Sequence, residues 1–160
     1  MQAFPEKSLS APEPSRPQSA PPQHQFDFVV GNWLVRDGAG KVIATASFSK
    51  PFGDFVLVEK WRRAGNSSQA LGVLGYVPAS GTWRREFIDD TGLMLTVEGK
   101  ADGASMVMTG NDYQSDITRM HRVSWTPAKN GSVEERWQTS TDDGRSWQEH
   151  FYGVFQHISE

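Results

Sequence analysis

Charged and aromatic residues alternate in three segments of this chain, a pattern expected where polar groups face an apolar enclosure. In a β-strand, residues two positions apart point to the same side of the sheet. By that period, one interior face could carry Glu59, Trp61, Arg63, Arg85, Asp89 and Glu135. Carboxylates and guanidiniums enclosed by apolar side chains pair with one another, and their pKa values shift. The pattern therefore indicates a buried polar site.

These residue types suit general acid–base chemistry. A glutamate with a shifted pKa can act as a general acid or base. An arginine, Arg85 or Arg63, could anchor a substrate carboxylate or stabilise an enolate, and a tyrosine could donate a proton. The predicted catalytic residues are Glu59, Arg85, Glu135 and Tyr76, with Tyr113 as an alternative proton donor. The opposing interpretation is a fixed polar network that only positions strands.

The chain is rich in tryptophan, with six residues of this type. Each supplies a large apolar surface and one N–H donor. A face that mixes aromatic and charged side chains suits a cavity with apolar walls and a few polar anchors. The first-choice function is therefore binding of a small hydrophobic, aromatic molecule. The predicted ligand-binding residues are Trp61, Arg63, Trp83, Phe87, Trp137 and Phe151.

Two other functions fit the same pattern. One is a cofactor-free enzyme, an isomerase, lyase or cyclase, which acts on an aromatic or polyketide-like molecule in this cavity. Perturbed carboxylates at the cavity floor would favour it. The other is a structural or interaction domain with a filled interior, in which a proline-rich N-terminal segment is the functional part and binds a partner.

Turn signals at short, even intervals between residues 37 and 144 predict the fold. Clusters of Gly, Asn, Asp and Pro let strands reverse, because glycine reaches positive φ without penalty. The segments between them predict ten strands, at about 30–36, 41–50, 54–63, 69–77, 82–89, 93–100, 104–110, 116–126, 132–140 and 146–157. A long antiparallel meander closes on itself. We therefore expect an all-β fold, a single up-and-down β-barrel.

Residues 1–24 differ from the rest in composition. They hold six of the nine prolines, separated mainly by serine, alanine and glutamine. Such a segment cannot bury a core. We expect a disordered or extended arm over residues 1–24 and one barrel domain over residues 25–160.

Charge and composition restrict the partners. The formal net charge is -3, and no long basic run is present, which argues against nucleic acid. No apolar run is long enough to span a bilayer. We expect a small-molecule ligand or substrate, no membrane insertion, and a monomer or homodimer.

The absence of cysteine excludes disulfides, thiol catalysis and iron–sulfur clusters. It is compatible with the cytoplasm and with the periplasm. The first residues lack the basic and apolar regions of a signal peptide. The sequence thus favours the cytoplasm, and a periplasmic location would require a signal peptide that had been removed.

Short motifs occur in a fixed order between residues 25 and 157. They are Phe26-Asp27-Phe28 with Gly31-x-Trp33, Val58-Glu59-Lys60-Trp61, Tyr76-x-Pro78 before Trp83, Trp125-Thr126-Pro127, the segment from Ser140 to Trp147, and Phe151-x-Gly153. Together they resemble a bacterial lipocalin-like (calycin-type) β-barrel family of unknown function. The resemblance implies a closed antiparallel barrel with an internal cavity. Lipocalins pack the first-strand tryptophan under an arginine of the last strand, whereas residues 151–157 contain no arginine.

The segment Ser140-x-Asp142-x-Gly144-x-Ser146-Trp147 resembles the Asp-box of sialidase-type propellers. In that motif the Asp and Ser side chains hold a hairpin turn and the Trp packs beneath it. A propeller needs the unit in several copies, whereas this chain has one. We therefore predict a structural turn without glycosidase activity.

The four histidines define the cofactor alternatives. A two-histidine metal site would need His121 with His150 or His157, and no H-E-x-x-H spacing is present. The layout also resembles nitrobindin-like barrels, which implies a haem ligand at His150 or His157. Strand parity puts these two on opposite faces unless a bulge intervenes. We expect no cofactor and no metal, with haem or a metal ion as alternatives.

Overall fold

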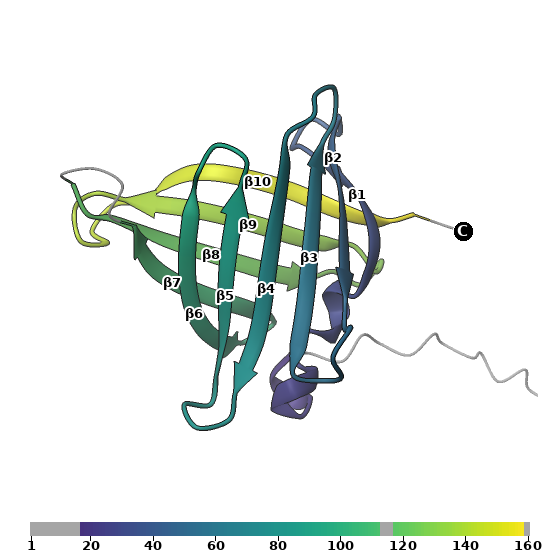
Figure 1. Cartoon of the computed structure of the whole chain (residues 1–160), viewed down its shortest axis with the longest axis vertical. Coiled ribbons are helices and arrows are strands. Elements are labelled where there is room, and N and C mark those ends of the chain that lie inside the picture. The colour runs from purple at the N-terminus through teal and green to yellow at the C-terminus, as the bar shows by residue number, and fades with distance from the viewer. Residues whose placement is uncertain (1–16, 113–116, 159–160) are drawn as a thin grey trace, which may run out of the picture.

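The computed structural model describes residues 17–112 and 117–158, which form short helical turns followed by a closed barrel (Figure 1). Its strands are β1 (Gly31–Arg36), β2 (Val42–Ser49), β3 (Val56–Arg63), β4 (Gln69–Val77), β5 (Thr82–Asp89), β6 (Met94–Asp102), β7 (Ser105–Asp112), β8 (Arg119–Pro127), β9 (Val133–Ser140) and β10 (Gln148–His157). The turns are 3-10 helices η1 (Pro17–Ser19), η2 (Pro22–His24) and η3 (Asp27–Val29). The predicted all-β, up-and-down barrel is confirmed, with strand bounds that differ by three residues at most.

Each strand pairs antiparallel with the next one in sequence, and β1 closes the barrel by pairing with β10. The odd-numbered strands therefore all run toward one end. The connections 37–41, 64–68, 90–93 and 141–147 lie at that end, which we call the open end. The even-numbered strands run toward the other end, where the helical turns lie. A residue late in β3, β5 or β9 is thus close to the open end.

Two glycines let the backbones of β6 and β7 approach each other closely. A Cβ atom on Gly99 would collide with the carbonyl oxygen of Val107, and one on Gly110 would collide with the carbonyl oxygen of Thr96. Because backbone cannot move aside as a side chain can, only glycine permits these approaches.

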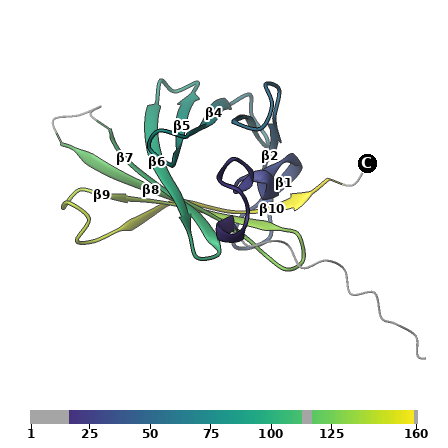
Figure 2. The same ribbon diagram turned by 90° about the horizontal axis from the view of Figure 1, so that it is seen from below.

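The helical turns pack into one end of the barrel (Figure 2). Phe26 is fully buried, with edge-to-face ring contacts to Trp83 at 5.4 Å and to Trp125 at 5.3 Å. The Trp83 indole N–H donates to the Pro22 carbonyl, 3.1 Å away. We call residues 17–30 the plug. Hydrophobic contacts and a satisfied indole thus close this end.

Part of the expected arm belongs to this plug. Residues 17–24 form η1 and η2 at the barrel end, whereas residues 1–16 lie outside the described residues. In the described chain no helix is long and apolar enough to cross a membrane.

A histidine covers the first-strand tryptophan at the seam between β1 and β10. His157 faces Trp33 across the ladder, and the two rings stack with centroids 3.8 Å apart. The Trp33 indole N–H donates to the Val29 carbonyl at 2.7 Å. His157 therefore takes the place over the tryptophan that the resemblance gives to arginine.

The Asp-box-like segment is a hairpin turn between β9 and β10. The Asp142 carboxylate accepts from the backbone N–H and hydroxyl of Ser146, at 2.9 and 2.6 Å, and from the Ser140 hydroxyl at 2.7 Å. These bonds, those from Ser146 first, lower the pKa of Asp142 to about 2. Its side chains are used in turn formation.

We predict that the plug stabilises the barrel through Phe26. Phe26→Ala should lower the free energy of unfolding by about 3 to 4 kcal/mol, because it leaves a void between two buried indoles. Urea unfolding measures the change. Phe52→Ala is the matched control, since Phe52 is 78% exposed and should change stability by less than about 0.5 kcal/mol. Equal effects of the two substitutions would mean that the plug contributes nothing to stability.

Candidate functional site

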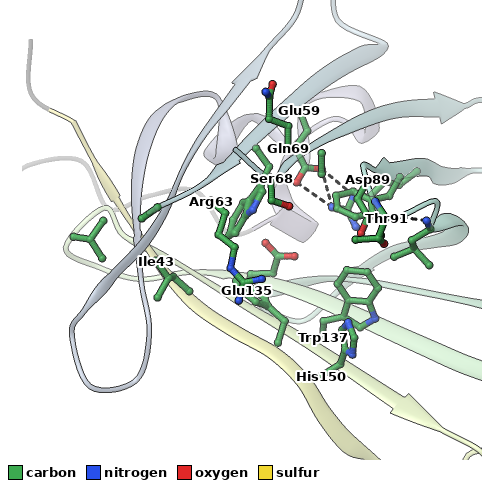
Figure 3. Close-up of a pocket in the computed structure, with 18 of the residues that line it drawn as sticks. Ile43, Glu59, Arg63, Ser68, Gln69, Asp89, Thr91, Glu135, Trp137 and His150 are labelled. Carbon is green, nitrogen blue, oxygen red and sulfur yellow. Dashed lines mark hydrogen bonds and ion pairs between the residues drawn. The ribbon is translucent and has the colours of Figure 1, made fainter. Parts of the chain in front are cut away.

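A cavity of about 530 Å³ opens at the open end of the barrel. Residues from β2, β3, β4, β5, β9 and β10 and from the connections at that end line it (Figure 3). The lining consists of Lys41, Val42, Ile43, Glu59, Trp61, Arg63, Ala64, Ser68, Gln69, Ala70, Arg85, Phe87, Asp89, Thr91, Leu93, Glu135, Trp137, His150 and Phe151. Its volume lies in the range of ordinary small-molecule sites.

Aromatic rings form much of the wall. Trp61 meets Phe151 edge-to-face at 5.4 Å, and Phe87 meets Trp137 in the same way at 5.6 Å. We call these four residues the aromatic wall. They come from four different strands, so their ring faces and edges surround the space instead of lying on one side.

Three ionisable residues lie deeper than the aromatic wall and form the polar cluster: Glu59, Arg85 and Glu135. Each stands two positions before an aromatic residue on a strand that runs toward the open end. All three are almost fully buried, with exposed fractions of 1%, 1% and 3%. The alternation in the sequence therefore places an ionisable layer beneath an aromatic one.

Glu59 and Arg85 form a two-pronged ion pair. Arg85 Nε donates to Glu59 Oε2 at 2.9 Å, and Arg85 Nη2 donates to Glu59 Oε1 at 3.0 Å and to Oε2 at 2.8 Å. The guanidinium also lies 4.3 Å from the ring centroid of Phe87 and 5.2 Å from that of Trp125. These contacts fix the arginine and satisfy the Glu59 carboxylate.

Glu135 is the unpaired member of the cluster. No hydrogen bond or ion pair of ordinary geometry joins its carboxyl group to a described residue, although the charge of Arg85 and the Trp125 indole act on it. Burial raises the pKa of Glu135 to about 8, with Arg85 opposing the rise and Glu59 adding to it. The Trp125 indole also favours the charged form, although its Nε1 reaches no acceptor with hydrogen-bond geometry. At neutral pH Glu135 is therefore mostly protonated and uncharged.

A further donor at the cluster is also unsatisfied. Within the described chain, Arg85 Nη1 and Trp125 Nε1 are the buried side-chain nitrogens without a hydrogen-bond partner. Figure 3 shows the Glu135 carboxyl group pointing into the space enclosed by the lining residues. Unsatisfied polar groups of this kind are costly and gather at functional sites.

Polar side chains also stand at the cavity mouth. The Asp89 carboxylate accepts from the Thr91 and Leu93 backbone N–H groups, at 2.9 and 3.1 Å, and from the Thr91 hydroxyl at 2.6 Å. It therefore holds the turn between β5 and β6. Lys41 and Arg63 line the same region, and no described carboxylate forms an ion pair with either.

A β-bulge brings His150 to the mouth. The pairing of β10 with β9 shifts register between Glu149 and Phe151, which leaves His150 as the extra residue. Its ring lies 4.7 Å from that of Trp137. Burial is the main cause that lowers the His150 pKa. Strand parity could not reveal this position, because a bulge re-aims a side chain.

A second polar network supports the aromatic wall from behind. The Trp137 indole N–H donates to His121 Nδ1 at 2.9 Å, and His121 Nε2 lies 2.6 Å from Asp112 Oδ2. Because Nδ1 accepts, the Nε2 proton must go to the Asp112 carboxylate. His121 therefore orients Trp137, and neither of its nitrogens is available to a metal.

The structure brings most predicted site residues together. Glu59, Arg85 and Glu135 meet in the polar cluster, and Trp61, Arg63, Phe87, Trp137 and Phe151 line the cavity. It does not bring Trp83 and Tyr76 there. Trp83 is bonded to the plug, and Tyr76 packs against Phe55 and Trp83. Tyr113 lies outside the described residues.

The histidines are dispersed. His150 stands at the cavity mouth, whereas His157 stacks on Trp33 at the seam and does not line the cavity. Among residues 17–112 and 117–158, no three His, Asp or Glu side chains are grouped as metal ligands would be. A single-histidine haem site in the cavity would have to use His150.

We predict that Gly72 is required for the Glu59–Arg85 pair. Glu59 faces Gly72 across the ladder, and a Cβ atom there would collide with Glu59 Oε2. Gly72→Ala should lower the free energy of unfolding by about 3 kcal/mol, the cost of disturbing a buried ion pair. Gly75→Ala is the matched control on the same strand, since its Cβ would meet only the Phe55 carbonyl at 3.9 Å. If denaturant unfolding gives equal stabilities, Glu59 can move without breaking the pair.

We predict a pH-dependent stability that depends on Glu135. The unfolded chain loses the Glu135 proton near the ordinary pKa of 4.5, whereas the folded chain keeps it up to about 8. Stability should therefore fall as pH rises between these values, by about 1.4 kcal/mol per pH unit relative to Glu135→Gln. Unfolding of both proteins in urea from pH 5 to pH 8 measures the difference. A constant difference across this range would contradict the raised pKa.

Comparison with known proteins adds no family assignment. No family model matches the chain, and no curated protein matches its sequence. The ten-stranded antiparallel barrel formed by the described residues is consistent with a calycin-like fold. The proposed function therefore rests on the fold and the cavity.

Proposed function

We propose that this barrel binds a small aromatic molecule in the cavity above the polar cluster. One observation carries the proposal: four aromatic side chains from four strands surround a cavity of about 530 Å³ that ends in buried polar groups. Apolar walls with a few inward polar groups are the usual composition of ligand sites. A flat aromatic ring would bury its faces and edges against the wall.

The charges at the cavity floor also favour an aromatic ligand over a highly charged one. Arg85 is neutralised by Glu59, and Glu135 is mostly protonated at neutral pH. The floor therefore carries little net charge although it contains three ionisable groups. Such a floor can exchange hydrogen bonds with a single polar group of the ligand.

A second candidate function is acid–base catalysis on an aromatic ketone, and the state of Glu135 favours it. Glu135 is buried, lies in the cavity, and has its pKa raised to about 8, close to a working pH. Its carboxylate could remove a proton from the carbon next to a carbonyl, and its carboxyl group could return one. Arg85 Nη1, which has no partner among the described residues, could donate to the enolate oxygen. In this scheme Glu59 holds Arg85.

Proton NMR in deuterated water distinguishes catalysis from binding. The catalytic candidate requires enolisable aromatic ketones that bind in the cavity to exchange the hydrogen next to the carbonyl. It also requires this exchange to disappear in Glu135→Gln. If the ketones bind without hydrogen exchange, the catalytic candidate is contradicted and the binding function remains.

We predict that filling the cavity from Ala70 blocks binding. Ala70→Phe should weaken binding of phenylbutanol at least about tenfold, because the new ring takes the place of the ligand. The fluorescence of Trp61 and Trp137, which line the cavity, reports binding. Val73→Phe, on the outer face of the same strand and 43% exposed, is the matched control and should bind normally. Equal affinities of the two variants for phenylbutanol would mean that the ligand does not bind in this cavity, which would contradict the proposal.

A further inference from the structure

The cavity contains one carboxyl group that the protein itself leaves uncompensated. Of the acidic residues that line it, Glu59 is held by Arg85 and Asp89 by the turn after β5. Glu135 alone has no such partner among the described residues, although it is 3% exposed. Burial of an acid without a partner costs free energy, which a ligand that supplies the partner can offset.

We propose that the ligand is an aromatic amine in its protonated form, and that its ammonium group pairs with the Glu135 carboxylate. The inference rests on the proposed function and names the chemical class of the ligand. An ammonium supplies both a countercharge and N–H donors, which are what a buried carboxylate lacks.

The surroundings of Glu135 suit a cation. Arg85 already lies over Phe87 and Trp125 in this part of the barrel, so aromatic rings here support a positive charge. Trp137 stands two positions beyond Glu135 on β9, on the same side of the strand, and Trp61 and Phe151 complete the wall. An ammonium at Glu135 would therefore lie close to ring faces, with the rest of the ligand toward the mouth.

Neighbouring cations do not take this role. Arg85 donates to both oxygens of Glu59 through Nε and Nη2, at 2.8 to 3.0 Å, so its charge is largely offset there. Its Nη1 has no partner among the described residues, and its charge still acts to lower the Glu135 pKa. Lys41 and Arg63 stand in the exposed mouth, where water screens their charges. His150 is biased toward its neutral form, first by burial. Arg85 is thus the main described cation that an ammonium at Glu135 would face, and Glu59 offsets its charge.

Binding should release a proton. In the free protein at neutral pH the group is Glu135–COOH, because burial, supported by Glu59, outweighs the opposing effects of Arg85 and Trp125. The amine enters as R–NH3+ and the pair is R–NH3+ with Glu135–COO−. The proton of the carboxyl group therefore goes to the buffer. A neutral ligand would leave the carboxyl group protonated and release nothing.

Calorimetric titration of the full chain with three matched probes tests the inference. The probes are phenylbutylamine, phenylbutanol and phenylbutyrate, which share the ring and differ in the charge of the polar end. At pH 7 the amine should bind at least about tenfold more tightly than the alcohol. Titrations in two buffers of different ionisation enthalpy should show about one proton released per amine and none for the alcohol. The affinity for the amine should rise between about pH 6 and pH 8.

A pair of variants on β9 locates the effect. In Glu135→Gln the proton release should disappear and the ratio of amine to alcohol affinity should fall to about one. Glu134→Gln is the matched control, since Glu134 points outward and accepts from the Tyr152 hydroxyl at 3.1 Å. It should keep the ratio and the proton release.

Each outcome decides the matter. Amine binding that is no tighter than that of the alcohol, or that releases no proton, overturns the inference, while binding of the alcohol keeps the proposed function. A preference for phenylbutyrate also overturns it. If none of the three probes binds, the proposed function fails and this inference fails with it. The proton count is made on the unmodified chain, so it stands even if Glu135→Gln does not fold.

Discussion

The buried ion pair between Glu59 and Arg85 is the interaction on which the site depends. It joins β3 to β5 across the inside of β4, and Gly72 on β4 leaves the room that the carboxylate needs. Taking two charges out of water is expensive, and only close, multiple hydrogen bonds offset that cost. Three such bonds exist here, at 2.8 to 3.0 Å. Because Arg85 forms its ion pair with Glu59, no described cation forms one with Glu135, and the charge of Arg85 only partly opposes the effect of burial on its pKa.

One end of the barrel contributes mainly to stability, and the other contains the candidate site. At one end the plug fills the interior, and Phe26 packs between Trp83 and Trp125. At the other end the interior contains the cavity of about 530 Å³. The hydrogen bonds from Trp137 to His121 and between His121 and Asp112 hold its aromatic wall in place. A closed barrel has no sheet edges to protect, so it can keep one end open without losing pairing.

The alternation of charged and aromatic residues predicted much of this site. The strands were predictable because glycine-rich turns divide the chain into segments of suitable length, and the two-residue period gives each segment a face. Parity could state that Glu59, Arg85 and Glu135 share the interior, but not how deep each lies. Trp83 has the same parity as Arg85 and Phe87, yet it points to the plug, since depth along the axis depends on strand tilt and direction.

The sequence by itself determined the all-β barrel, its strands and the residues that face inward, because these follow from local turn chemistry and a local period. Only the tertiary structure decided which charges pair. Glu59 and Glu135 look alike in sequence, each two positions before a tryptophan, but one meets Arg85 with good geometry and the other does not. The bulge at His150 and the packing of residues 17–30 into the barrel end were also decided there. These features depend on contacts between residues far apart in the chain, which no local pattern encodes.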